Sequence, residues 1–151
     1  MNQWPLSNLV ICLGIFLTGI ANATQPPKGF RDFSWGSPIS NRIKKLSGPT
    51  SDGTALYIPK SGQALAPLLG IPVAEEMYSF TYGKFYSGSA WLDGQENFER
   101  MKGAITRELG APSFTNGRLF KWKWPSSKIE VHLYYQAKFM RTTVIYLNNS
   151  I

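Results

Sequence analysis

Cysteine is nearly absent from this sequence of 151 residues, in which Cys12 is the one occurrence. A single cysteine cannot form a disulfide within the chain, and it cannot supply the set of thiolates that a cysteine-based metal site requires. Cys12 also lies in an N-terminal stretch that we expect to be removed, so the remaining chain has no thiol nucleophile. Side-chain packing must therefore hold the domain together, and aromatic residues make up 14% of the sequence. A disulfide-free exported domain suits a bacterial periplasm better than a small eukaryotic secreted scaffold.

Histidine is just as scarce, because His132 is the only one. Without a second histidine or a retained cysteine, the residues of a zinc site or a catalytic triad are missing. Glu75 and Glu76 are neighbours in a strand-like segment, so their side chains point to opposite faces and cannot share a proton. The glycines match neither the dinucleotide-binding nor the P-loop spacing. We therefore predict a protein that is not an enzyme and uses no cofactor or metal; a small hydrolase built on distant carboxylates or on His132 is the remotest alternative.

Charge is missing from the N-terminal segment, since no charged residue precedes Lys28. Residues 9–20 form an apolar run that is shorter than the ~20 residues of a membrane-spanning helix. Small residues follow at Ala21 and Ala23, in the spacing that a signal peptidase recognises. We predict that residues 1–23 are a signal peptide, cleaved between Ala23 and Thr24, and that the protein is periplasmic or secreted in a bacterium. Because residues 1–8 carry no lysine or arginine, an uncleaved membrane anchor is the alternative.

After a short polar lead-in at residues 24–29, the sequence predicts a single α+β domain over residues 30–151. Its clearest element is a helix over Gln95–Leu109, preceded by Asp93 as a cap and ended by Gly110. Apolar side chains recur in this stretch at steps of three and four residues, which places them on one face of a helix. They are Phe98, Met101, Ile105 and Leu109. We expect this stripe to pack on a sheet that carries Phe120, Trp122, Tyr78 and Phe80.

A second helix is predicted after Ser37 and Pro38, an N-cap followed by proline at the first helical position. Its buried face would carry Ile39, Ile43 and Leu46. Strand-like runs occupy residues 30–35, 54–58, 75–82, 84–92, 118–124, 128–136 and 139–148. The order of one helix and three strands thus occurs twice, and Leu46–Tyr57 also parallels Leu109–Lys121 in sequence. We therefore predict an internal duplication of this unit, and a two-layer α+β sandwich in which two helices cover one face of an antiparallel sheet of about six to seven strands.

Lysine and aromatic residues alternate in residues 118–124, so they fall on opposite faces of a strand. Phe120 and Trp122 would face the helices, whereas Lys121 and Lys123 would lie on the open face. The predicted binding residues on this open face are Lys121, Lys123, His132, Tyr134 and Arg141. Trp124 completes the set; it shares the side of Phe120 and Trp122 and would be partly exposed at the rim of the sheet. An ordinary solvated face is the alternative, and a one-residue shift in register would invert the assignment of Arg141.

The net charge of +7 lies entirely downstream of residue 27 and favours acidic partners. Together with the lack of a catalytic set, it predicts a non-catalytic binding domain that engages an acidic protein partner, as an inhibitor, immunity or accessory factor. The alternative is that the basic and aromatic face binds an anionic envelope polymer or a lipid head group. Nucleic acid is a poor candidate, because an exported protein rarely meets it. Membrane contact is expected only through an uncleaved signal or through surface charge, and the sequence leaves the oligomeric state open.

Overall fold

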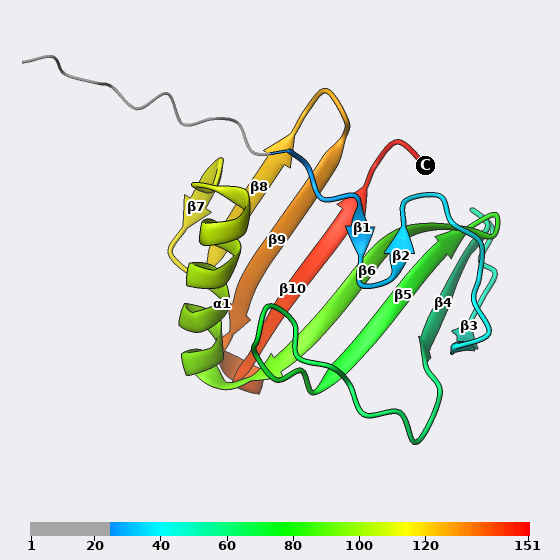
Figure 1. Cartoon of the computed structure of the whole chain (residues 1–151), viewed down its shortest axis with the longest axis horizontal. Coiled ribbons are helices and arrows are strands. Elements are labelled where there is room, and N and C mark those ends of the chain that lie inside the picture. The colour runs from blue at the N-terminus through cyan, green and yellow to red at the C-terminus, as the bar shows by residue number, and fades with distance from the viewer. Residues whose placement is uncertain (1–24) are drawn as a thin grey trace, which may run out of the picture.

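The computed structural model describes residues 25–151, so the predicted signal segment, its cleavage site and Cys12 lie outside the described residues. Eight strands form one antiparallel sheet in the order β3-β4-β5-β6-β10-β9-β8-β7, and a hairpin of two short strands is separate from it (Figure 1). One α-helix, which follows β6, is present among these residues. The elements are β1 (Gly29–Phe30), β2 (Phe33–Ser34), β3 (Ile43–Ser47), β4 (Thr54–Pro59), β5 (Glu75–Thr81), β6 (Lys84–Asp93), α1 (Gly94–Leu109), β7 (Phe114–Asn116), β8 (Leu119–Trp124), β9 (Ile129–Gln136), a 3₁₀ turn (Ala137–Phe139) and β10 (Arg141–Asn148).

The chain builds the sheet from two meanders. Strands β3 to β6 form the first meander, α1 follows, and β7 to β10 form the second. The last strand of each meander, β6 and β10, lie side by side in the middle of the sheet, in register from Ser87 opposite Leu147 to Asp93 opposite Arg141. In Figure 1, α1, the β1–β2 hairpin and the β4–β5 connection all lie in front of the sheet. We call this covered side the inner face and the opposite side the outer face.

Helix α1 confirms the element that the sequence predicted most clearly. Its buried side chains are Phe98, Met101, Ala104, Ile105 and Leu109, and Gly110 ends the helix at a φ of 82°. The Phe98 ring lies 5.8 Å from the Phe120 ring and 6.1 Å from the Tyr135 ring, centroid to centroid. Trp122 Nε1 donates a hydrogen bond of 2.9 Å to the Gly110 carbonyl. The helix therefore covers the β8–β10 half of the inner face, as expected for Phe120 and Trp122.

The β1–β2 hairpin covers the other half of the inner face, where a single strand over residues 30–35 was expected. Arg31, at a φ of 55°, turns the chain so that Phe30 and Phe33 both point into the core. Phe30 lies 5.9 Å from Tyr78 and 5.4 Å from Tyr146, between ring centroids. Gly88 lies directly beneath Phe30, because a Cβ at residue 88 would be 2.1 Å from the Phe30 Cδ1. Tyr78 and Phe80 lie on the same inner face of the sheet on which α1 packs, as expected, and their rings contact the hairpin through Phe30 and Phe33.

The predicted second helix is wrong, because residues 43–47 form the edge strand β3. Its apolar residues fit a helical period, but only Ile43 is buried, whereas Ile39 and Leu46 are 44% and 57% exposed. Pairing with β4 at the end of the sheet, with Lys44 opposite Ile58, determines the structure here. The expected repeat of one helix and three strands is not found either. Each half contributes four strands, and within residues 25–151 only the second half contains a helix, so the sheet has eight strands rather than the six to seven expected.

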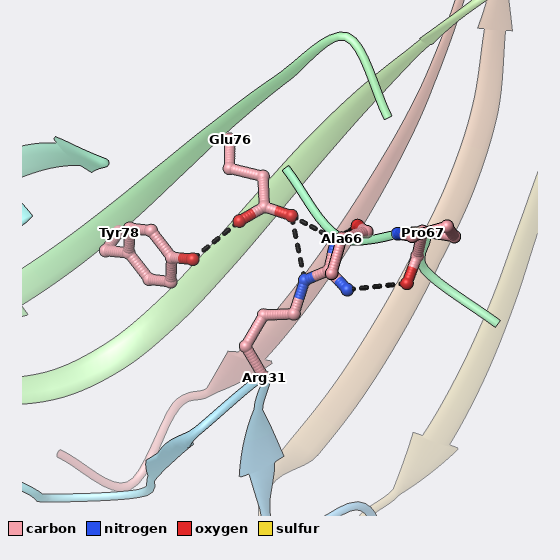
Figure 2. Close-up of polar contacts among 5 residues, drawn as sticks. All are labelled: Arg31, Ala66, Pro67, Glu76 and Tyr78. Carbon is pink, nitrogen blue, oxygen red and sulfur yellow. Dashed lines mark hydrogen bonds and ion pairs between the residues drawn. The ribbon is translucent and has the colours of Figure 1, made fainter. Parts of the chain in front are cut away.

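A buried polar network fixes the β4–β5 connection to the inner face (Figure 2). Arg31 Nε donates a hydrogen bond of 2.8 Å to Glu76 Oε1, and Arg31 Nη2 contacts the same oxygen. The remaining guanidinium donors reach the carbonyls of Pro67, at 2.8 Å, and Ala66, at 2.6 Å. Tyr78 donates its hydroxyl proton to Glu76 Oε2 over 2.6 Å. Both oxygens of the buried carboxylate are thus satisfied, and the arginine joins the hairpin, β5 and the connection.

Candidate binding surface

No element of residues 25–151 covers the central strands of the sheet on the outer face (Figure 1). Cross-strand register places two rows of side chains on it, each residue opposite the next. The first row runs from β8 to β5 through Lys121, His132, Ile145, Ser89 and Met77. The second row runs from β9 to β5 through Tyr134, Thr143, Trp91 and Glu75. The predicted residues Lys121, His132 and Tyr134 therefore share a face, together with apolar residues that the prediction did not include.

A cluster of four charged or titratable side chains occupies the β8–β9 end of this face: Lys121, Lys123, Glu130 and His132. Lys123 Nζ lies 3.7 Å from Glu130 Oε1, and His132 Nε2 is hydrogen-bonded to Glu130 Oε2 at 2.6 Å. Partial burial raises the pKa of Glu130, but the His132 hydrogen bond and the positive charges of Lys123 and Lys121 outweigh it, so that the pKa lies below its ordinary value. A carboxylate at the centre of the cluster thus offsets part of the positive charge that was predicted there.

Arg141 and Trp124 do not join this cluster. Arg141 lies at the start of β10, opposite Asp93, and its Nη1 is 3.4 Å from Glu75 Oε2 on the outer face. Trp124 lies on the inner side of β8, in alternation with Lys123, where it is half-buried and packs against the core. The six predicted residues are therefore divided among three places: the β8–β9 cluster with Tyr134 beside it, the Arg141–Glu75 pair, and the inner face at Trp124.

The centre of the outer face is apolar and aromatic. Four side chains here are half-buried even though no helix of residues 25–151 lies over them: Trp91, Met77, Ile145 and Tyr134. Thr143, between Tyr134 and Trp91 in the second row, is fully buried by its neighbours, and its Oγ1 has no hydrogen-bond partner among the described residues. Large apolar side chains within a polar rim are typical of a surface that another molecule covers.

A groove borders this apolar centre at the β3–β6 end of the sheet, with a volume of about 460 Å³. We call it the β4–β5 groove, because the first residues of that connection form one wall. Its apolar lining comes from separate segments and consists of Leu46, Ile58, Leu65, Met77 and Trp91. Its polar rim includes Lys60, Ser61, Gln63 and Glu75. The Arg31 network holds the connection at Ala66 and Pro67, just beyond this wall.

The sequence analysis did not include two residues of this surface, although the alternation of side chains along β9 and β6 could have placed them there. Glu130 precedes His132 by two residues, so it had to share the face of His132. Trp91 alternates with Ala90 and Leu92, which are fully buried, so it had to point to the outer face. The β4–β5 groove had no such signal, because its lining brings together residues as far apart as Leu46 and Trp91.

His132 is hydrogen-bonded to Glu130, and no hydroxyl group of residues 25–151 is hydrogen-bonded to its ring. Over the same residues, no group of three or more His, Cys, Asp or Glu side chains is arranged to hold a metal ion. The helix in this part of the chain is also too short and too polar to cross a membrane.

Comparison with known proteins adds no further assignment. No protein-family model matches the chain, and neither the curated proteins nor the solved structures contain a significant match to it.

Proposed function

We propose that this protein is a non-catalytic binding domain, exported to the periplasm or the exterior of a bacterium, which engages a protein partner as an inhibitor, immunity or accessory factor. The observation that carries the proposal is the uncovered outer face. Helix α1, the hairpin and the β4–β5 connection lie together on the inner face, while Trp91, Tyr134 and Met77 stay partly exposed on the other. Aromatic side chains in the middle of a surface, with charged residues around them, are the usual anchors of protein interfaces. Export is proposed from the sequence of residues 1–23.

A protein partner fits this face better than an anionic envelope polymer or lipid head group. Lys123 is close to Glu130 and Arg141 is close to Glu75, so two of the outer-face cations already have a carboxylate neighbour. A polyanion would compete with these pairs and would find few free cations across the apolar centre. The net charge of +7 instead acts at long range, by attracting an acidic partner before contact.

The test is capture of a partner from envelope extract at low and high salt, followed by affinity measurement with the isolated partner. Tyr134→Ala should weaken binding at least about tenfold at both salt concentrations, since it removes an aromatic anchor. Lys121→Gln with Lys123→Gln should weaken binding at low salt only. Arg100→Gln with Arg107→Gln, which removes two exposed cations from α1, is the matched control and should leave binding unchanged.

The opposite pattern would overturn the proposal. Binding that survives Tyr134→Ala, but that moderate salt abolishes and the two lysine substitutions weaken, would identify a polyanion ligand. Equal loss in the α1 control would show that the net charge alone determines capture. Melting temperatures of all variants must be within a few degrees of the unaltered protein, so that loss of binding is not loss of fold.

A further inference from the structure

We infer that the β4–β5 groove binds an extended acidic segment of the partner, with one apolar side chain seated against Met77 and Trp91. The inference rests on the proposed function, because it names the part of the protein partner that the outer face recognises. It differs from the predicted binding surface, since the groove lies at the opposite end of the sheet from Lys121 and Lys123.

The floor of the groove is apolar surface that the described chain leaves open. Ile58, Met77 and Trp91 supply it from the neighbouring strands β4, β5 and β6. Leu46, on the edge strand β3, extends it and is 57% exposed. A ligand side chain that covers these residues removes apolar surface from water on both partners, which favours binding.

The size of the groove suits one side chain of an extended segment. Its volume of about 460 Å³ can receive one large side chain with the backbone on either side of it.

The charges around the groove favour an acidic ligand. Lys60 lies on the rim, and Lys44 Nζ donates a hydrogen bond of 2.9 Å to Ser61 Oγ on the same rim. Neither lysine forms an ion pair with a carboxylate in the described chain. Of the two acidic residues at the groove, Glu76 is ion-paired with Arg31 and Glu75 lies 3.4 Å from Arg141. Two unpaired positive charges thus flank an apolar floor.

The wall of the groove is held in place before any ligand arrives. Arg31 fixes the carbonyls of Ala66 and Pro67 from the inner face. At the end of the connection, the Ala74 N–H donates to the Trp91 carbonyl at 2.8 Å, and at its beginning the Lys60 N–H donates to the Arg42 carbonyl at 3.2 Å. A ligand that enters a preformed groove does not have to order this connection, so more of its contact energy appears as affinity.

The test uses the full protein and fluorescein-labelled heptapeptides of glutamate and aspartate with a central leucine, measured by fluorescence anisotropy. Replacing the central leucine by alanine should weaken binding about 10- to 100-fold. Lys44→Gln with Lys60→Gln should weaken binding about tenfold at low salt. Arg100→Gln with Arg107→Gln is the matched control, because it removes two exposed cations from α1, which lies on the inner face and away from the groove. The control should bind like the unaltered protein.

Three results would overturn the inference. Poly-glutamate that binds as tightly as the leucine peptide would show attraction by charge alone. Equal loss in the Lys44/Lys60 variant and in the α1 control would show that the groove is not the site. If no acidic peptide binds while capture of the partner still depends on Tyr134, the groove is not used and the proposed function stands. The proposed function fails separately, if capture does not depend on Tyr134.

Discussion

The contact between Gly88 and Phe30 allows a sharp test of how the hairpin is seated. Gly88→Ala adds a single Cβ, which would lie 2.1 Å from Phe30 Cδ1, 2.4 Å from Cγ and 2.7 Å from Cβ. Rotating the phenyl ring cannot relieve the last of these contacts, because the Cβ atom is fixed to the backbone. The hairpin must therefore move away from β6 by about 1 Å to restore ordinary contact distances.

The expected cost follows from this movement. Overpacking a core costs about 1–3 kcal/mol, and full exposure of a buried phenylalanine costs about 1.5–3 kcal/mol. Phe30 is 2% exposed, so we expect a loss near 2 kcal/mol. With an unfolding entropy of ~2.1 cal/mol/K per residue, a domain of this size should melt roughly 7 °C lower.

The assay is thermal and urea unfolding of Gly88→Ala beside Gly103→Ala. At residue 103, in α1, an added Cβ would have Arg107 Nη1 as its nearest neighbour, at 3.5 Å, which is an ordinary contact. Alanine is favoured over glycine inside a helix by up to about 1 kcal/mol, so this variant should gain stability. The same chemical change should thus have opposite effects at the two positions.

A double-mutant cycle identifies Phe30 as the cause. In a Phe30→Ala background the added methyl group has space, so Gly88→Ala should cost less than about 0.5 kcal/mol there. If Gly88→Ala costs as much without the Phe30 ring as with it, or stabilises the protein as Gly103→Ala does, the described seating of the hairpin is incorrect.

Three further predictions concern other parts of the fold. Ile105→Asp should unfold the domain or cost more than about 4 kcal/mol, because residue 105 is fully buried, whereas Arg107→Asp on the exposed side of α1 should cost less than about 1 kcal/mol in urea unfolding. Arg31→Met leaves the Glu76 carboxylate buried without its cation, which should cost about 3–5 kcal/mol and allow protease to cut the β4–β5 connection first; adding Glu76→Met should restore most of the stability. Burial raises the pKa of Tyr78, with a contribution from its hydrogen bond to Glu76, and burial with the nearby Glu108 raises the pKa of Tyr146. Both stay protonated in the folded state, while the unfolded chain loses these protons near pH 10, so this contribution to stability should be complete below that pH and fall above it. Tyr146→Phe should therefore reduce the fall in melting temperature between pH 9 and 11, whereas the exposed control Tyr82→Phe should not. An equal effect of the two substitutions would contradict this.

The sequence predicted the elements whose side chains carry their own period. Helix α1 has apolar residues on one stripe, and β5 and β6 have a glycine turn between them. There, Tyr82 and Gly83 take the φ values of 47° and 77° that a tight hairpin turn needs. Strand β3 could not be predicted from local spacing, because the spacing of Ile43 and Leu46 fits a helix. Pairing with β4 makes this segment a strand. The β1–β2 hairpin turns at Arg31, a residue type that does not signal a turn.

For the candidate surface, too, local patterns predicted one part, and the other part required the three-dimensional structure. Alternation along β8 and β9 was enough to expect Lys121 and His132 on one face, where the register places them as direct neighbours. It could not show that Glu130 binds His132, because that requires the distance between two side chains. It also could not show that Arg141 lies with Glu75, since β5 and β10 are brought together by β6 between them.

The seam between β6 and β10 has a consequence for how the chain folds. Every other strand pair in the sheet joins neighbours in sequence, but this seam joins residues about 50–60 positions apart. Each meander can therefore form early from local contacts, whereas closing the seam carries the larger loss of chain entropy. Phe30 contacts Tyr78 on one side of the seam and Tyr146 on the other, so its site is complete only when β10 has joined β6. The hairpin leaves the ribosome before the rest of the domain, and we expect it to be the last part to dock.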